Sequence, residues 1–250
     1  MANSRSGDSV LDRFERILGA FDAQQNSMTV AALAERADIP LATAYRLVDD
    51  LIHRGLLARN PDRQITLGIR LWELASRCSP ALDLREAAMP FMEDIQAVIR
   101  QHTQLAVLRE DEVLFIERLS GRESVVNQAR IAGRLPVHRS SSGLVLLAFS
   151  EPAVQEAYLT RHPDAGVMTG AASYDFRSLL ARVRHQGYAH LDGLVDPDTS
   201  GIAVPVRHGH GDVAALGVVV PREDGPNPHA IVPLLTAGAR GIARAMGTQH

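Results

Sequence analysis

The segment that most clearly suggests chemistry is a run of three serines and a glycine, Ser140 to Gly143, which leads directly into apolar residues. The pattern predicts a helix from about Ser141 to Phe149, so the serines lie at its N-terminus. Backbone N–H groups there have no partners within the helix and favour an anion, and serine hydroxyls add further donors. The segment therefore predicts a site for a carboxylate-bearing small molecule, with Arg130, Arg134 and Arg139 as candidate partners. The simpler alternatives are helix capping by one serine and solvated arginines.

Other polar clusters are weaker candidates. His208 and His210 lie two residues apart in a glycine-rich turn, but no cysteine or third ligand accompanies them, so we expect solvated turn residues. A catalytic triad can be written from Ser200, His190 and Asp192, yet nothing in the sequence positions it. The chain has no Gly-x-Ser-x-Gly, Gly-x-Gly-x-x-Gly or Walker motif. We therefore expect no catalytic residues, no metal and no cofactor.

The composition is that of a globular protein, with 46% hydrophobic and 22% charged residues among 250. This length allows one large or two ordinary domains. Apolar stretches fall far short of the roughly 18 residues that a membrane span needs, so we expect no membrane partner. The polar N-terminus and the single Cys78 indicate a cytoplasmic protein without disulfides. Because the net charge is −3, any nucleic-acid surface must come from local patterning.

Such patterning occurs near the N-terminus. Apolar residues over Val10–Phe21 recur at helical spacing, a second helix begins near Thr29, and a third runs from Pro40 to about Arg54. The short turn between the last two places Asp38 where glycine is usual, and Asp tolerates the left-handed conformation better than most residues. This pattern predicts a helix-turn-helix, whose second helix reads base edges in the major groove. The predicted contact residues on that helix are Pro40, Leu41, Ala42, Thr43, Tyr45 and Arg46.

Two short strands follow, Leu56–Arg59 and Gln64–Leu67, and they predict a hairpin, or wing, beside the reading helix. Residues 54–70 carry four arginines against one acid. We expect Arg59 and Arg63 on DNA phosphates, because phosphate contacts fix the register while the helix reads bases. The alternative is a small three-helix packing module with solvated arginines.

Residues 68–80 predict a connecting helix that ends at Ser79 and Pro80. Trp72 lies beside its apolar face, and either a partner subunit buries it or it packs locally on the first helix. The residues expected on the apolar face are Leu71, Leu74, Ala75 and Cys78.

The rest of the chain alternates between hairpins and helices, which indicates an α+β domain with helices on an antiparallel sheet. Pro90 is expected to kink or restart the first helix. The predicted elements are a helix over 81–101, hairpins over 104–119 and 202–220, a strand beginning at Val125, Val126 and Gln128, and helices beginning near Ser141, Pro152, Phe176 and His229.

Taken together, these motifs resemble the IclR family of bacterial transcription regulators over about residues 10–246. The resemblance implies an N-terminal all-α winged helix-turn-helix plus a C-terminal α+β GAF-like domain with an antiparallel sheet. We expect the DNA-binding domain at 1–67, the linker helix at 68–80 and the effector-binding domain at 81–250. The segments that carry the resemblance are Thr29–Leu47, Gly55–Leu57, Leu67–Gly68, Gly133–His138, Gly187–Tyr188, Gly201–Val206 and Ala214–Leu216.

The resemblance also implies a function. Such a protein binds double-stranded operator DNA as a homodimer or homotetramer, represses or activates a catabolic operon, and responds to a small carboxylate effector. The alternative is a small-molecule-binding or hydrolytic enzyme with an accessory helical N-terminal domain. By resemblance, the effector pocket is lined by Leu135, Val137, Ser140, Ser141, Ser142, Leu191 or Asp192, Gly201 and Val218.

Two departures from the family pattern concern the effector. The family commonly has lysine where this chain has Leu144, and often cysteine where it has Gly201. Loss of the cysteine side chain is expected to leave space. With Val137 and Leu191 nearby, this favours a bulkier, partly apolar acid, such as an aromatic carboxylate, over a two-carbon acid.

Overall fold

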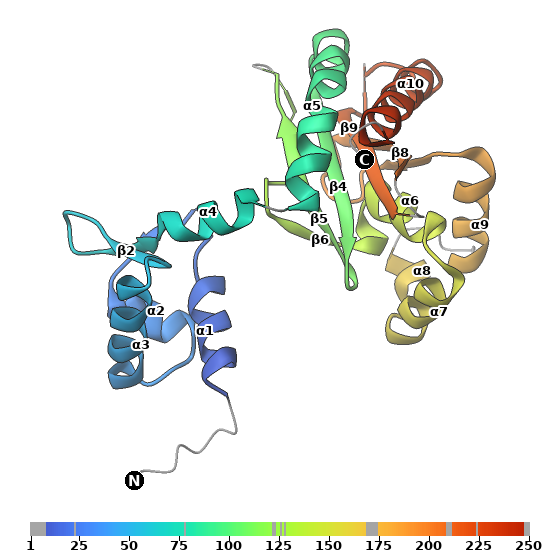
Figure 1. Ribbon diagram of the computed structural model, residues 1–250. Helices are drawn as coiled ribbons and strands as arrows, with labels where there is room; N and C mark the ends of the chain where they lie inside the picture. The colour runs from blue at the N-terminus through green and yellow to red at the C-terminus, as the bar shows by residue number, and fades with distance from the viewer. Residues whose placement is uncertain are drawn as a thin grey trace. The chain divides into compact units, whose positions relative to one another are not determined.

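The computed structural model describes residues 9–22, 24–77, 79–121, 124–125, 127, 129–168, 175–208, 212–223 and 225–247. The chain divides into two compact units, Met1–Ser79 and Pro80–His250 (Figure 1). Among the described residues, no helix combines the length and apolar character that crossing a bilayer requires. The predictions that involve Cys78, Val126, Gln128 and His210 lie outside the described residues.

The first unit is a three-helix core with a small sheet and a final helix. Ser9 and Asp12 form a reciprocal capping box at the start of the first helix, and Thr29 caps the second as predicted. The sheet order is β1-β3-β2, with antiparallel pairs. The elements are α1 (Val10–Gly19), β1 (Ser27–Met28), α2 (Val30–Arg36), α3 (Leu41–His53), β2 (Leu57–Arg59), β3 (Ile65–Leu67) and α4 (Ile69–Arg77).

The turn between α2 and α3 has the predicted conformation. Asp38 adopts φ 49°, so the left-handed position expected of this residue is confirmed. At the other end of α3, the Gly55 N–H donates to Ile52 O and the Leu56 N–H donates to Leu51 O, with Gly55 at φ 73°. This Schellman arrangement ends the reading helix and starts the wing.

The α4 helix is the predicted connecting helix, but its Trp72 does not pack on the first helix, as one of the two interpretations expected. None of its residues is buried, and Trp72 is 66% exposed. The interpretation that Trp72 packs locally on the first helix is therefore wrong. Leu74 and Ile69 are exposed as well, so α4 carries an apolar surface that the described residues of this unit leave uncovered.

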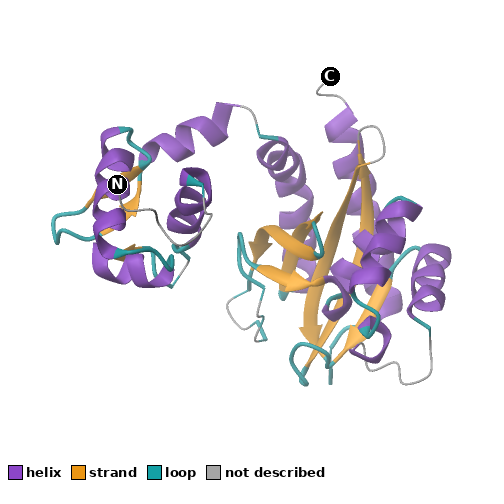
Figure 2. Ribbon diagram, turned by 90° about the horizontal axis from the view of Figure 1, so that it is seen from below, coloured by secondary structure: helices purple, strands orange, loops and turns teal. Residues whose placement is uncertain are grey.

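The second unit is an antiparallel six-stranded sheet, in the order β6-β5-β4-β9-β8-β7, with helices on both faces (Figure 2). The two predicted hairpins are β4–β5 and β8–β9, and they join through β4 and β9. The elements are α5 (Pro80–Ile99), β4 (His102–Arg109), β5 (Glu112–Leu119), β6 (Arg134–Pro136), a 3-10 turn (Val137–Arg139), α6 (Ser141–Phe149), α7 (Pro152–Arg161), α8 (Ala165–Met168), α9 (Phe176–Gln186), β7 (Ala189–Asp192), β8 (Thr199–His208), β9 (Asp212–Pro221) and α10 (Pro228–Gly247).

Alternation along the strands, interrupted by one register shift between β4 and β5, divides the apolar residues between two cores. Leu105, Ile202 and Val218 pack with α5 and α10 on one face, whereas Phe115 and Ala203 pack with α6 and α9 on the other. Both predicted fold classes, the winged helix-turn-helix and the α+β domain, are confirmed.

Three local expectations need correction. The α5 helix continues through Pro90, so the proline does not restart it. Val125 lies outside any strand. The edge strand β6 was not predicted, because three residues give too short a pattern, and pairing with β5 is what makes it a strand.

Candidate nucleic-acid interface and ligand pocket

The α3 helix presents a polar face and buries an apolar one. Ala44, Leu47, Val48 and Leu51 are buried in the core of the first unit. On the other side, Leu41 and Tyr45 each expose 49% of their surface. This exposure leaves the face free to enter a major groove. Of the predicted contact residues, Thr43 is half-buried and the others are exposed, namely Pro40, Leu41, Ala42, Tyr45 and Arg46.

The tip of the wing is a tight turn that projects an arginine. The Arg63 N–H donates to Asn60 O at 3.0 Å, and the Gln64 N–H donates to Asn60 Oδ1 at 2.9 Å. These bonds place Arg63 at φ 61°, a conformation that non-glycine residues rarely adopt. Its side chain is exposed, and the described residues offer it no carboxylate partner.

Arg59, at the base of the wing, has a carboxylate nearby. Its Nη2 lies 3.6 Å from Asp49 Oδ1, so this ion pair joins the wing to α3. Arg70 is paired likewise with Glu73, at 2.8 Å. The positive field of the wing is therefore smaller than the count of arginines predicts, because two of the four arginines of residues 54–70 are paired with acids.

The second unit contains a pocket on the α6 face of the sheet, whose empty space is about 490 Å³ when the open solvent at its mouth is included. Its walls come from β4, β5, β6, the start of α6, and the β7–β8 connection. Its lining combines apolar side chains with amide, hydroxyl and charged groups. It is lined by Gln104, Phe115, Asn127, Ala129, Leu135, Arg139, Ser140, Ser141, Leu191, Leu194, Val195, Asp196, Thr199, Gly201 and Val219.

The three serines at the start of α6 have different roles. The Ser140 hydroxyl accepts from the Gly143 N–H at 2.9 Å and is the helix N-cap. Ser141 lines the pocket, and the described residues give its hydroxyl no hydrogen-bond partner. Ser142 is fully buried and does not line the pocket, and its Oγ has no partner among the described residues. Helix capping and lining of the pocket with a hydroxyl that no described residue engages are thus divided between neighbouring serines.

Five of the residues predicted for the pocket line it: Leu135, Ser140, Ser141, Leu191 and Gly201.

The structure places the other four predicted residues elsewhere. Val137 lies in the α6 core, and Ser142 is buried beside β9. Val218 faces the opposite core, because residues alternate along β9 and its neighbour Val219 points into the pocket. Asp192 contacts His190 Nε2 at 3.0 Å instead.

Of the three candidate arginines, Arg139 lines the pocket, whereas Arg134 pairs with Glu112 at 3.3 Å and Arg130 does not reach the lining. Sequence reasoning missed Gln104, although a glutamine directly before the four apolar residues Leu105–Leu108 was a usable signal. Asn127 was missed because a loop brings it to the pocket, and loop paths leave no periodic pattern, whereas Thr199 is the first residue of β8, ahead of the predicted hairpin.

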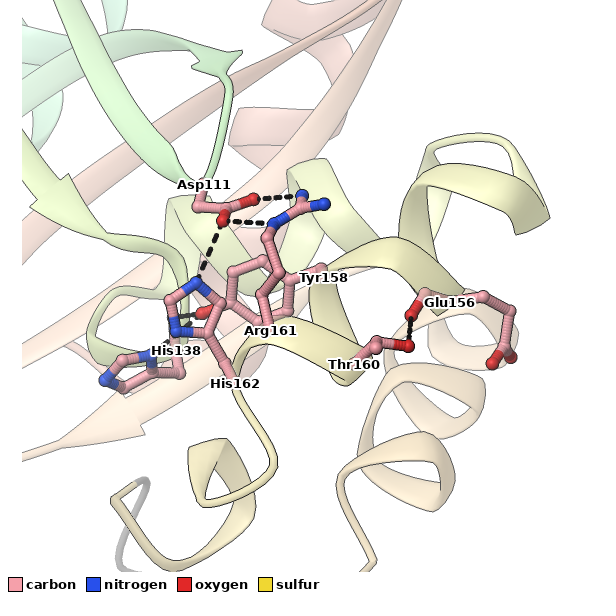
Figure 3. Close-up of polar contacts among 7 residues, drawn as sticks. All are labelled: Asp111, His138, Glu156, Tyr158, Thr160, Arg161 and His162. Atoms are coloured by element: carbon pink, nitrogen blue, oxygen red, sulfur yellow. Dashed lines mark hydrogen bonds and ion pairs between the residues drawn. The ribbon is translucent and has the colours of Figure 1, made fainter.

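Behind the pocket wall, a polar cluster holds the turn that precedes Ser140 (Figure 3). The Tyr158 hydroxyl lies 2.8 Å from His138 Nδ1, and the His138 N–H donates to the same oxygen at 3.3 Å. Burial raises the pKa of Tyr158 to about 12, so its hydroxyl stays protonated. Burial first, and then His162 and Arg139, lower the pKa of His138, which favours a neutral ring accepting at Nδ1.

The same cluster reaches the β4–β5 turn through an acid. Asp111 receives two hydrogen bonds from Arg161, at 2.7 and 2.6 Å, and lies 3.0 Å from His162 Nε2. The hydrogen bonds from Arg161 lower the pKa of Asp111 to about 2. Because the His162 ring stacks on Tyr158 with centroids 4.5 Å apart, the cluster links this turn to the pocket wall.

The structure brings together Ser200, His190 and Asp192, but not as a catalytic triad. Ser200 Oγ lies 2.8 Å and Asp192 Oδ1 lies 3.0 Å from the same ring atom, His190 Nε2. A triad needs the serine and the carboxylate on opposite ring nitrogens, so that histidine can accept the serine proton while the acid holds its other N–H. One nitrogen cannot do both. Among the described residues, no group of three His, Cys, Asp or Glu side chains could hold a metal ion.

Comparison with known proteins agrees with this division of the chain. The family model for the bacterial transcriptional regulator IclR C-terminal domain matches residues 78–244, and the IclR helix-turn-helix domain matches residues 10–61. The chain belongs to the IclR family. Its curated relatives are named as regulators, so this IclR-family protein is a DNA-binding transcriptional regulator.

Relatives cover most of its length. One solved structure is an IclR homolog from Microbacterium hydrocarbonoxydans, complexed with 4-hydroxybenzoate. Its sequence is 41% identical to this chain and the TM-score is 0.86, and the match covers 96% of this chain and 100% of that one. The Pca regulon regulatory protein of Pseudomonas putida is 29% identical over 81% of this chain and 70% of its own length. The regulator XynR of Escherichia coli is 27% identical over 83% of this chain and 84% of its own.

The two departures from the IclR family pattern can now be placed. Leu144 is buried in the α6 core. A Cβ atom at Gly201 would lie 3.0 Å from Ser141 Oγ, so the space expected above Gly201 is occupied by that hydroxyl. The expectation of extra room at this point is therefore wrong, and Ser141 supplies a polar group where the family often has cysteine.

Proposed function

We propose that this protein regulates a catabolic operon by binding its operator in a sequence-specific manner, and that a small aromatic carboxylic acid controls this binding. The observation that carries the proposal is the pocket, whose lining combines the apolar side chains of Phe115, Leu135 and Val219 with hydrogen-bond donors that have no partner among the described residues. The homolog at 41% identity in complex with 4-hydroxybenzoate supports the ligand class. The arrangement at His190 gives no support to the hydrolytic alternative.

The carboxylate would be bound at the start of α6. The first N–H groups of a helix have no partners within it, and the nine residues of α6 align enough dipoles to favour an anion there. The Ser141 hydroxyl adds a donor at this point. Arg139 lies on the pocket lining and supplies positive charge.

The DNA would be bound by α3 and the wing. Arg46 is exposed and suits guanine O6 and N7, while Thr43 and Tyr45 lie beside it for further base-edge contacts. Arg63, at the tip of the wing, would contact a phosphate. Arg59 would do so while remaining tied to Asp49, which orients it.

The protein would act as a dimer through its N-terminal unit, or as a tetramer built from such dimers. The support is the uncovered apolar surface of Ile69, Trp72 and Leu74 on α4, together with Val10 and Leu11 on α1. Two reading helices would then enter successive major grooves about 34 Å apart, and the operator would be a pseudo-palindrome. Light scattering of the wild type and of Trp72→Glu would test this, and a wild-type monomer would contradict it.

The test of the function is fluorescence anisotropy with the DNA upstream of the protein's own gene. It is run at two salt concentrations, with and without a panel of aromatic and short-chain acids. Sequence-selective binding that one aromatic acid alters is the expected result. Selective binding that no acid alters would refute the proposed effector, and binding to no fragment would refute the regulator itself.

A further inference from the structure

A glutamine side chain is buried in the pocket wall on a central strand of the sheet. Gln104 lies on β4, between β5 and β9, and only 3% of it is exposed. Its side chain lines the pocket beside apolar groups such as Phe115 and Val219. A buried amide has two donors and an acceptor to satisfy, and leaving them unpaired is costly.

The hydrogen bonds around Gln104 fix which way its amide points. The Ala129 N–H is a backbone donor, and it donates to Asn127 Oδ1 at 2.9 Å. Asn127 must therefore turn its Nδ2 toward Gln104, and it donates to Gln104 Oε1 at 3.4 Å. Because Oε1 is engaged by Asn127, the NH₂ group of Gln104 takes the other position.

That NH₂ group has no partner in the protein as far as the structure describes it. The described residues place no acceptor within hydrogen-bonding distance of Gln104 Nε2. Two N–H donors on a side chain 97% removed from solvent are thus available to whatever occupies the pocket. A ligand oxygen at this point would accept a hydrogen bond from one of them.

The donor is well separated from the start of α6. Gln104 pairs with Gly217 on β9, and Gly201, beneath Ser141, pairs with Val219 on the same strand. The Cα atoms of Gln104 and Gly201 are therefore about 12 Å apart, from two strand spacings of about 4.8 Å and two residues of about 3.4 Å. Side chains that reach inward from both positions leave room for one aromatic ring with a polar group at each end.

We propose that Gln104 determines effector specificity by donating a hydrogen bond to an oxygen on the ring, opposite the carboxylate. The inference rests on the proposed function, because it assumes that the carboxylate binds at α6. It assigns to the pocket a narrower ligand class: aromatic acids with an oxygen acceptor at the far end. An apolar or donor-only group there would leave the Gln104 amide unsatisfied.

The first test uses the wild-type chain and isothermal titration calorimetry with four acids. We expect 4-hydroxybenzoate to bind at least about tenfold more tightly than benzoate or the nearly isosteric 4-methylbenzoate, because a buried donor without a partner costs about 1–3 kcal/mol, which is about 5- to 150-fold. We expect 4-aminobenzoate to bind no better than benzoate, since its amino group is a poor acceptor that faces two donors. Equal affinities for the hydroxy and methyl acids would overturn the inference.

The second test compares Gln104→Leu with Gln96→Leu. Gln96 lies on α5, where its Oε1 accepts from Thr103 on the other face of the sheet, so it is the same substitution outside the pocket. Gln104→Leu should lose the preference for the hydroxy acid over the methyl acid while still binding benzoate, and Gln96→Leu should keep that preference.

If Gln104→Leu retains the preference, Gln104 is not the determinant although the effector class stands. If the wild type binds none of the acids, the inference fails together with the proposed effector, while DNA binding is still judged by anisotropy. Should Gln104→Leu not fold, the wild-type series decides alone.

Discussion

The wing offers a test in which charge and backbone conformation can be separated. Arg63 adopts φ 61° at the tip of the wing. Alanine meets the same steric penalty there as arginine, so Arg63→Ala should leave the free energy of unfolding nearly unchanged. Glycine has no such penalty, and Arg63→Gly should raise the free energy of unfolding by up to about 1 kcal/mol. Both substitutions remove the same positive charge from the wing.

The expected loss of DNA affinity follows from counterion release. Each phosphate contact contributes about 0.9 to the slope of log affinity against log salt. A dimer that uses Arg63 twice should lose about 1.8 of that slope in either variant. Between 50 and 200 mM salt, the wild-type affinity should therefore fall about twelvefold more than that of the variants. The loss should be similar for all DNA sequences, because phosphates carry no base identity.

The assay is anisotropy over a salt series, with thermal melting of each variant. Arg100→Ala is the matched control: Arg100 is also an exposed arginine at positive φ, 56°, but it lies in the effector-binding unit. Its substitution should leave the salt slope unchanged. If Arg63→Ala and Arg63→Gly also leave the slope unchanged, the wing does not contact phosphates. If Arg63→Gly binds DNA like the wild type, the charge has no role.

Two further predictions concern the cluster behind the pocket wall. Tyr158→Phe removes the hydroxyl that bonds the His138 N–H and Nδ1. The affinity for the aromatic acid, measured by calorimetry, should fall about five- to tenfold, while the DNA affinity of the acid-free protein should stay unchanged. The control is Tyr188→Phe, in the opposite core, which should change neither affinity. The pKa of Asp111 is lowered from 3.8 to about 2. The ionised carboxylate therefore stabilises the folded protein by about 2 kcal/mol above pH 4, and this contribution is lost as the pH falls toward 2. Melting temperatures of the wild type and of Asp111→Asn should differ at pH 7 and converge near pH 2, and a constant difference would contradict this assignment.

Sequence patterns predicted the elements whose residues are periodic over several turns or whose ends have chemical signals. The wing, α3 and α9 belong to this group: Gly187 ends α9 at φ 83°, as a stop signal should. Long-range pairing produced the features that were missed. The two residues of β1 and the three of β6 are strands only because β3 and β5 pair with them.

The part of the pocket formed by the start of α6 and by the family's sequence motifs was predictable from the sequence. Ser141 and Gly201 face each other because a helix start lies over a strand, and both were predicted. A one-residue error on β9 replaced Val219 by Val218, since neighbouring strand residues face opposite sides. Asn127 reaches the pocket through a loop whose path depends on side-chain hydrogen bonds, and these cannot be read from local sequence.

The two polar ends of the pocket belong to different elements, and this has a consequence for signalling. Gln104 is on β4, whereas Ser141 begins α6. An effector changes DNA binding only through its different affinity for two arrangements of the protein, and a ligand that holds both ends disfavours any arrangement in which β4 and α6 separate. Benzoate would engage only the α6 end. At saturating concentrations, where differences in ligand affinity no longer matter, 4-hydroxybenzoate should therefore change the anisotropy-measured affinity for the operator, while benzoate should leave it close to that of the free protein. Equal effects of the two saturating acids would show that contact with α6 alone transmits the signal.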